Sequence, residues 1–179
     1  MPELLRLEHF GFTYPQQPCP ALADVSLTVR QGEFWVLCGA SGCGKTTLLR
    51  QLKPALRPHG AAEGRILFDG QPLDDLPPHR QAADIGFVLQ SPEEQTVTDK
   101  VWHELAFGLE SLGCDTPSIR RRVAEMASFF GIQDWFHRKV DELSGGQKQL
   151  LALASVMVLQ PRPVSYTHLR AHETLRHLV

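Results

Sequence analysis

Short runs of apolar residues dominate the first half of the chain, and their spacing is typical of β-strands. Apolar and polar positions alternate after Glu3 and stop at Pro15. A later run ends at an Asp69-Gly70 turn, and a short continuous apolar run ends at Gln90. The strands predicted from these runs are Leu4–Tyr14, Val25–Val29, Arg65–Phe68 and Ile85–Leu89.

A further apolar run leads directly into a glycine-rich loop. Glu33–Cys38 has the sequence E-F-W-V-L-C and predicts a strand, which G-A-S-G-C-G-K-T follows at Gly39–Thr46. Helical spacing then extends over Lys45–Leu52. In such an order the loop's N–H groups and the positive end of the helix face an anion, so we expect a phosphate site. A glycine-rich turn that binds nothing is the alternative.

From about Thr98 the apolar spacing changes to the 3.6-residue period of helices. Thr116 followed by Pro117 predicts the start of a second helix, with Thr116 as its cap. We therefore expect a helical insert. Its two predicted apolar faces are Val101, Leu105, Leu109 and Leu112, and Ile119, Val123, Met126 and Phe130.

The stretch L-S-G-G-Q-K-Q at Leu143–Gln149 predicts a capped helix. Ser144 would be the cap and Gln147 the third helical residue of a capping box, while Gly145 and Gly146 leave the first N–H groups open to an anion. An ordinary capped helix is the alternative. The apolar run that follows is about half the length of a bilayer span, so it predicts a buried core helix.

Composition excludes several classes of function. The chain has 179 residues, 42% of them hydrophobic, which suits one globular domain. A formal net charge of -2 gives no field that attracts nucleic acid or anionic lipid, and the basic run Arg120–Arg122 is expected to be a solvated helix face. The four cysteines lack metal-ligand spacing, so we expect neither a zinc site nor disulfides, and the N-terminus lacks a secretory signal.

The phosphate loop and the L-S-G-G-Q stretch together resemble ABC-type ATPases, over residues 1 to about 162. The resemblance implies an α/β P-loop NTPase fold, with a RecA-like parallel sheet core, N-terminal antiparallel strands and an inserted helical subdomain. The expected organisation is a nucleotide-binding core at 1–92, a helical subdomain at 93–143, a signature helix at 144–162 and a non-family tail at 163–179.

The resemblance also implies a site for ATP and Mg²⁺. Lys45 would reach the β- and γ-phosphates, Thr46 would ligate Mg²⁺, and Thr47 would bond an α-phosphate oxygen. Tyr14 would stack on adenine, with simple packing as its alternative. Gln90 would contact Mg²⁺ and the attacking water, with an unremarkable polar strand end as its alternative. The loop residues expected around the phosphates are Gly39, Ala40, Ser41, Gly42, Cys43 and Gly44.

In the same family the signature segment binds the γ-phosphate held by the opposite subunit. That role would fall to Ser144, Gly145, Gly146 and Gln147, and it implies a head-to-tail dimer of like or unlike subunits. The segment after Gln90, S-P-E-E-Q-T-V-T-D-K-V-W-H-E-L-A-F-G-L-E-S-L-G, resembles ATPase subunits of energy-coupling-factor importers, which take up vitamins or metal ions such as cobalt and nickel.

This branch implies integral membrane partners, a peripheral location at the cytoplasmic face of the membrane, and no nucleic acid. The other class is that of ABC ATPases acting on DNA or ribosomes, which usually carry long coiled-coil inserts or basic stretches that are missing here.

The family pattern stops after Arg162. The family continues with an aliphatic strand ending in Asp-Glu and later a switch histidine, whereas this chain has P-V-S-Y-T and a single later carboxylate, Glu173, which we do not expect to be a catalytic base. No catalytic residue is therefore identified. We expect the fold to be incomplete at this end and to lack a core strand. We also expect the chain to hydrolyse ATP at a rate near background.

Three histidines of the tail, His168, His172 and His177, are expected to lie on a solvated amphipathic segment rather than to bind a metal. The abrupt change favours the hypothesis that the reading frame leaves the natural gene near Pro163, because S-Y-T-H-L-R-A-H-E-T resembles translated adapter sequence. Long-read resequencing that reproduced this ending would refute it.

Overall fold

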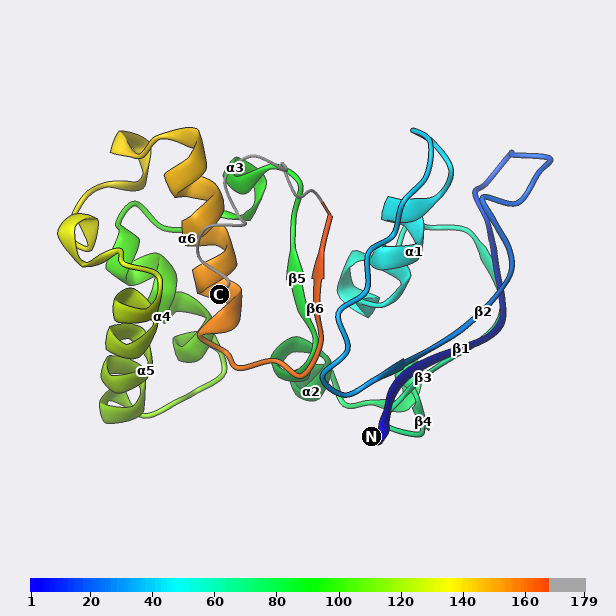
Figure 1. Cartoon of the computed structure of the whole chain (residues 1–179), viewed down its shortest axis with the longest axis horizontal. Helices are drawn as coiled ribbons and strands as arrows, with labels where there is room; N and C mark the ends of the chain where they lie inside the picture. The colour runs from blue at the N-terminus through cyan, green and yellow to red at the C-terminus, as the bar shows by residue number, and fades with distance from the viewer. Residues whose placement is uncertain (168–179) are drawn as a thin grey trace. The chain divides into compact units, whose positions relative to one another are not determined.

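The computed structural model describes residues 1–167 and divides the chain into two compact units, Met1–Ile85 and Gly86–Val179 (Figure 1). The predicted His168, His172, Glu173 and His177 lie outside the described residues. Each unit has its own hydrophobic core.

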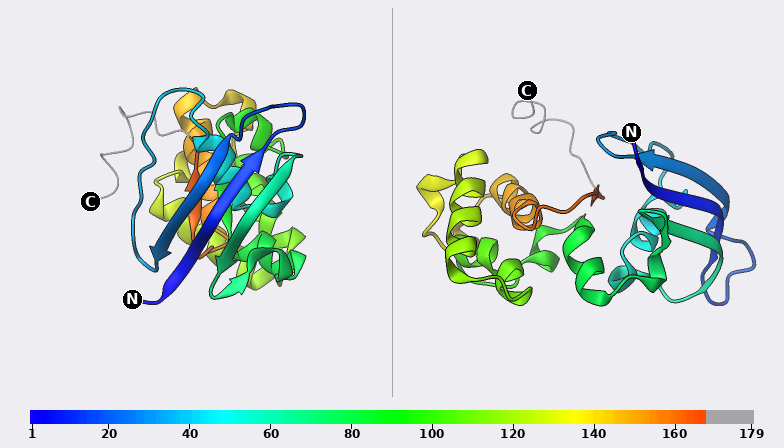
Figure 2. Two further views of the ribbon diagram at one scale, coloured as in Figure 1. Left: turned by 90° about the vertical axis from the view of Figure 1, so that its right-hand side faces the viewer. Right: turned by 90° about the horizontal axis from the view of Figure 1, so that it is seen from below.

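The first unit is built on a four-stranded antiparallel sheet, in the order β2-β1-β3-β4. Figure 2 shows its long strands side by side. The Asp69-Gly70 turn joins the last two strands, and both of its residues have positive φ, 53° and 77°, as a tight two-residue hairpin requires. The antiparallel strands and the turn are confirmed. The strands are β1 (Glu3–Thr13), β2 (Leu22–Arg30), β3 (Ala61–Phe68) and β4 (Gln71–Pro72).

One face of this sheet is apolar and packs against helix α1 (Lys45–Gln51). Leu48 and Leu52 join the same buried cluster as Leu7 and Phe68. Helix α2 (Pro78–Asp84) and the 3-10 turns η1 (Pro54–Leu56) and η2 (Leu73–Asp75) complete the unit. The alternation of apolar residues in β1 thus positions the helix that follows the glycine-rich loop.

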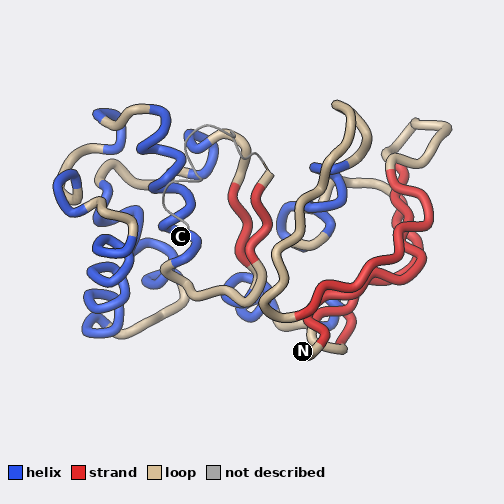
Figure 3. Tube along the Cα trace, viewed as in Figure 1, coloured by secondary structure: helices blue, strands red, loops and turns tan. Residues whose placement is uncertain are grey.

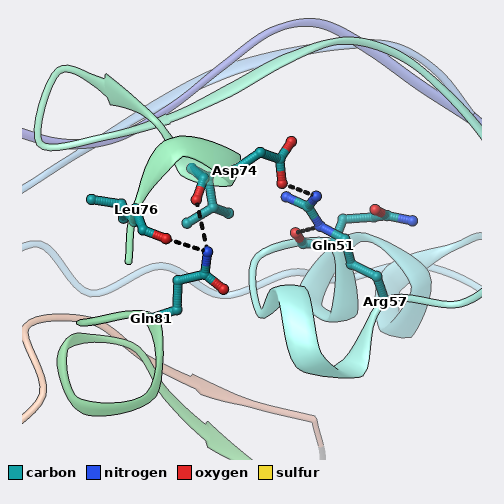
Figure 4. Close-up of polar contacts among 6 residues, drawn as sticks. Gln51, Arg57, Asp74, Leu76 and Gln81 are labelled. Carbon is teal, nitrogen blue, oxygen red and sulfur yellow. Dashed lines mark hydrogen bonds and ion pairs between the residues drawn. The ribbon is translucent and has the colours of Figure 1, made fainter. Parts of the chain in front are cut away.

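Side chains tie the connections of this unit to one another (Figure 4). Arg57 donates from Nε to the carbonyl of Gln51, at 2.9 Å, and forms an ion pair with Asp74. Gln81 of α2 donates from Nε2 to the carbonyl of Leu76 at 2.7 Å. These bonds fix the irregular segments on either side of β3 and β4.

Lys53 closes the carboxyl end of α2. Its Nζ donates to the carbonyls of Gln81, Ala82 and Ile85 at 2.8, 3.1 and 2.5 Å, which satisfies carbonyls left open at a helix end. Burial lowers the pKa of the Lys53 ammonium below its usual value. The contact joins the segment after α1 to the end of the unit.

The predicted strand at Glu33–Cys38 is wrong for this structure. Residues 33–40 form a loop (Figure 3), and the side chains of Phe34 and Val36 are 80% and 61% exposed. An apolar run becomes a strand only when a neighbouring strand accepts and donates its backbone hydrogen bonds. Within residues 1–167 no strand pairs with this segment, so its apolar residues remain at the surface.

The second unit is mainly helical and confirms the two predicted helices. Helix α4 packs on both α5 and α6, with Val101, Leu105 and Leu109 fully buried. Val123 is the buried centre of the α5 face. The elements are β5 (Gly86–Val88), α3 (Pro92–Gln95), α4 (Val101–Ser111), α5 (Thr116–Phe129), η3 (Gln133–Trp135), η4 (Val140–Glu142), α6 (Gly145–Met157) and β6 (Val164–Tyr166).

Two details of this unit differ from the predictions. The cap of α5 is Asp115 and not Thr116, because the Asp115 carboxylate accepts a hydrogen bond from the N–H of Ser118 at 3.0 Å. Thr116 is the first helical residue instead.

The segment after Arg162, for which no core strand was expected, forms β6. It pairs in parallel with β5, with Gly86 opposite Val164 and Val88 opposite Tyr166. Valine and tyrosine both favour strands, and Tyr166 packs on the small cluster of Val88, Ala152 and Val156. The same burial raises the pKa of the Tyr166 hydroxyl.

Candidate nucleotide-binding site

The glycine-rich loop of the first unit is held closed by its own lysine. Lys45 Nζ donates to the carbonyls of Gly39 and Ala40 at 2.8 and 2.7 Å, and it lies 3.5 Å from the Cys43 sulfur. The ammonium therefore sits over the loop, and the loop leads into the first turn of α1. A phosphate placed there would meet a positive charge and the open N–H groups of a helix start.

Gly44 is the position where this loop most needs glycine. Its φ is 91°, which disfavours other residues, and a Cβ there would lie 2.7 Å from the carbonyl oxygen of Ala21. The loop therefore turns sharply against the start of β2 as it enters the helix. Its remaining residues Ser41, Gly42 and Cys43 are exposed, as a ligand-binding loop requires.

The structure brings two of the predicted ATP residues, Tyr14 and Thr47, into contact. The Tyr14 hydroxyl lies 2.9 Å from the Thr47 hydroxyl, which is buried in α1. Phe12 packs edge-on against the Tyr14 ring, with ring centres 4.9 Å apart. The ring is thereby fixed beside the helix that follows the phosphate loop.

Thr46 and Gln90 offer oxygen donors of the type that Mg²⁺ prefers. Thr46 is exposed in the first turn of α1, so its hydroxyl can be reached. Gln90 follows β5 in the second unit and is exposed. Among residues 1–167 no cluster of three His, Cys, Asp or Glu side chains forms a metal site. The donors fit Mg²⁺ held mainly by a nucleotide.

The predicted capping box of α6 is confirmed. The Ser144 hydroxyl accepts from the N–H of Gln147 at 3.3 Å, and the Gln147 side-chain oxygen accepts from the N–H of Ser144 at 2.9 Å. Leu143 anchors the start of the helix in the core. Ser144, Gly145 and Gly146 are exposed, so the start of this helix is open to solvent.

Sequence reasoning missed two polar residues that organise the segment after Gln90. Gln95 bridges the end of β5 and helix α6 through its side-chain amide. Glu104 is only 5% exposed and accepts three hydrogen bonds from Val97 and Thr98. The spacing Gln90, Pro92, Gln95 was visible in the sequence, but the partners of Gln95 lie elsewhere in the chain.

None of the helices within residues 1–167 combines the length and the apolar character needed to cross a bilayer. Tyr14 and the phosphate loop belong to the first unit, whereas Gln90 and the signature residues belong to the second.

Comparisons with known proteins show which family this chain belongs to. The profile of the ABC transporter family matches residues 22–164. A putative ABC transporter ATP-binding protein of Bacillus cereus is 47% identical over 156 residues, which is 87% of this chain and 28% of that protein. The energy-coupling factor transporter ATP-binding protein EcfA of Syntrophomonas wolfei is 35% identical over 162 residues, or 89% of this chain and 58% of that protein.

The solved structure of CbiO1 from Clostridium perfringens, described as part of the ABC transporter complex CbiONQ, is also similar. The TM-score is 0.81 and the sequence identity is 27%. The match covers 93% of this chain and 65% of the CbiO1 chain. The chain thus spans only part of the relatives it matches. The fold is that of an α/β P-loop NTPase, and the chain belongs to the ABC transporter family.

Proposed function

We propose that this chain is the nucleotide-binding part of an ATP-hydrolysing subunit of an ABC importer. The observation that carries the proposal is the closed phosphate loop, with Lys45 bonded to the carbonyls of Gly39 and Ala40. An arriving triphosphate would take the ammonium from these carbonyls, because a charged phosphate is a stronger acceptor than a neutral carbonyl. Tyr14, fixed beside Thr47, would then receive the adenine.

Mg²⁺ would be held by the Thr46 hydroxyl and Gln90, and it would neutralise charge on the β- and γ-phosphates. The capped start of α6 supports a second contact. Ser144, Gly145, Gly146 and Gln147 would bind the γ-phosphate held by another ABC ATPase subunit, of the same or a different kind. The active form would be a dimer with ATP at its interface.

Integral membrane subunits would be the other partners, at the cytoplasmic face of the membrane. The segment after Gln90 resembles energy-coupling-factor ATPases, and one relative is named for an energy-coupling factor transporter; both support an importer of a vitamin or a transition-metal ion. No nucleic acid is expected as a partner, since the net charge is -2.

The alternative is an ATP-binding fragment that does not hydrolyse ATP. The sequence after α6 favours it, because Glu173 is the only carboxylate beyond Glu142 and no Asp-Glu pair follows the helix. Catalysis in P-loop NTPases depends on positioned metal, water and charge, so the loss of these acids would bring turnover to near background.

Calorimetric titration with Mg²⁺ and ATP tests nucleotide binding. Lys45→Ala should weaken binding at least about tenfold, since a charge-assisted contact contributes roughly 1.5–3 kcal/mol. Arg50→Ala removes a positive charge from the exposed side of the same helix and is the matched control. If the unsubstituted chain does not bind ATP at millimolar concentration, both the hydrolase and the ATP-binding fragment are refuted.

Steady-state ATPase activity then distinguishes the hydrolase from the ATP-binding fragment. Turnover that disappears with Lys45→Ala supports the hydrolase, whereas Lys45-dependent binding without turnover supports the fragment.

The signature contact is tested by Gly145→Asp. A Cβ at Gly145 meets no atom within 4 Å, and an acid in the first turn suits a helix, so the variant should fold. The added charge should repel a γ-phosphate and abolish ATP-dependent dimers in size-exclusion chromatography. Dimers that form as readily as in the natural chain would contradict the role of this segment.

A further inference from the structure

The side chain of Gln95 joins two elements that carry predicted site residues. Its Oε1 accepts from the N–H of Leu89 at 2.9 Å, and its Nε2 donates to the carbonyl of Ala152 at 2.9 Å. Leu89 immediately precedes Gln90, and Ala152 lies in the middle of α6, the helix that Ser144 caps. One amide group therefore bonds the strand end at Gln90 and the signature helix at the same time.

Other contacts make this junction stiff. Val88 of β5 packs on Ala152 and Val156 of α6, directly beside the Gln95 bonds. Lys148 in the second turn of α6 lies 3.8 Å from Glu93 of α3. Helix α3 is thus attached to α6 at two points about one turn of helix apart, which hinders rotation of one against the other.

The chain that follows α3 is fixed as well. Glu104 accepts hydrogen bonds from the N–H groups of Val97 and Thr98, so the chain after α3 is held on helix α4. Between Gln90 and Thr98 the chain therefore has no long free stretch that would absorb a displacement. A shift at Gln90 has to move α3, and α3 is bonded to α6.

We propose that Gln95 is a positioning residue that transmits displacement of the strand end at Gln90 to the signature helix. Its amide is suited to this, because it supplies an acceptor to the strand and a donor to the helix in one planar group. The functional meaning of this link rests on the proposed function, in which Gln90 lies beside Mg²⁺ and the start of α6 binds γ-phosphate. The mechanical link itself needs no nucleotide.

Amide hydrogen exchange measured by NMR on this chain tests the link. Gln95→Leu removes both hydrogen bonds and should speed exchange of the Leu89 amide roughly two- to tenfold, as the loss of one hydrogen bond implies. Gln95→Glu keeps the acceptor for Leu89 but sets a carboxylate oxygen against the Ala152 carbonyl. This variant should leave exchange of the Leu89 amide slow and still break the contact with α6. Glu94→Leu, at an exposed neighbour in the same turn, is the control.

Transmission is then measured by loosening the strand end with Gln90→Gly, which raises backbone freedom there. The reporter is the N–H of Val156, which donates to the carbonyl of Ala152 within α6. Gln95 donates to the same carbonyl. Gln90→Gly should speed exchange at Val156 by about twofold or more in the natural and Glu94→Leu backgrounds. It should have no such effect in the Gln95→Leu or Gln95→Glu backgrounds.

Two results would overturn the proposal. One is an unchanged Val156 amide when Gln90→Gly is made in the natural background. The other is an effect that persists after Gln95 is replaced, because α6 would then respond through packing alone. Neither depends on ATP, so a failure here is distinct from a failure of Lys45-dependent binding. If Gln95→Leu does not fold, the near-isosteric Gln95→Glu variant still decides the question.

Discussion

Removal of the Glu104 carboxylate is expected to destabilise the second unit by about 2–3 kcal/mol. Its Oε2 accepts from Val97 N at 3.1 Å, Thr98 N at 2.8 Å and Thr98 Oγ1 at 3.0 Å. Each hydrogen bond contributes about 1 kcal/mol net, which gives roughly 3 kcal/mol for Glu104→Ala. Val97 is exposed, so water can replace part of the loss, and the lower end of the range follows.

Glutamine is the matched substitution at this position. Glu104→Gln keeps an oxygen of similar shape as acceptor for the same three donors but loses the negative charge, so we expect a cost of about 1 kcal/mol. Glu125→Ala removes a carboxylate from an exposed position of α5 and should change stability by less than about 0.5 kcal/mol.

Urea unfolding followed by far-UV circular dichroism measures these differences. With a denaturant slope of about 2 kcal/mol/M, Glu104→Ala should lower the midpoint by roughly 1 M, and Glu104→Gln by about half that. A midpoint shift for Glu104→Ala no larger than that for Glu125→Ala would refute the view that this carboxylate fixes the segment. Equal damage from Ala and Gln would show that charge, and not the acceptor geometry, is responsible.

Three further predictions concern other parts of the chain. Gln51 is 2% exposed and its Nε2 has no hydrogen-bond partner among residues 1–167, so Gln51→Met should stabilise the first unit by about 1 kcal/mol in urea unfolding; a lower midpoint would show that the amide is satisfied. The Ser118 side chain and then its N–H lower the pKa of the Asp115 carboxyl, so its cap stabilises α5 above the unfolded pKa of about 3.9 and is lost as the pH falls through the lowered folded pKa. Hydrogen exchange in α5 should show this acid dependence, and Asp115→Asn should remove it; a dependence that survives the substitution must come from another group. Val36→Lys should reduce light scattering of concentrated protein without changing its circular dichroism, because Val36 is 61% exposed, and equal scattering would mean that aggregation starts elsewhere.

Features that depend on residues close in sequence were predictable. The Asp69-Gly70 turn needs two residues that tolerate positive φ, and the capping box needs only Ser144 and Gln147 three residues apart. The apolar faces of α4 and α5 follow from helical spacing. Each of these features is set by local geometry, so the order of residue types was sufficient.

Features that depend on distant partners were not predictable in the same way. Glu33–Cys38 has the composition of a strand, yet a strand exists only beside another one, and sequence does not show which neighbours are present. Val164–Tyr166 shows the converse, because β5 supplies a neighbouring strand to a segment in which no core strand was expected. The role of Gln95 depends on Ala152, 57 residues further along the chain.

The assignment of Asp115 in place of Thr116 as the cap of α5 is a smaller case of the same limit. Both residue types cap helices, and they stand side by side in the chain. Only the backbone conformation at the turn decides between them, and the preceding segment determines that conformation. The roles proposed for the phosphate loop and the signature residues remain predictions until binding is measured.

Each unit consists of one uninterrupted stretch of chain, and this affects how the protein is made on the ribosome. The strands of the first sheet are all synthesised by Pro72, while the signature helix at Gly145–Met157 is still to come. Hairpins form in microseconds, whereas the residues after Ile85 take roughly 5–20 s to translate. The N-terminal unit therefore has ample time to fold as a nascent chain, with the apolar side chains of Phe34–Leu37 already exposed at its surface while the second unit is still being made.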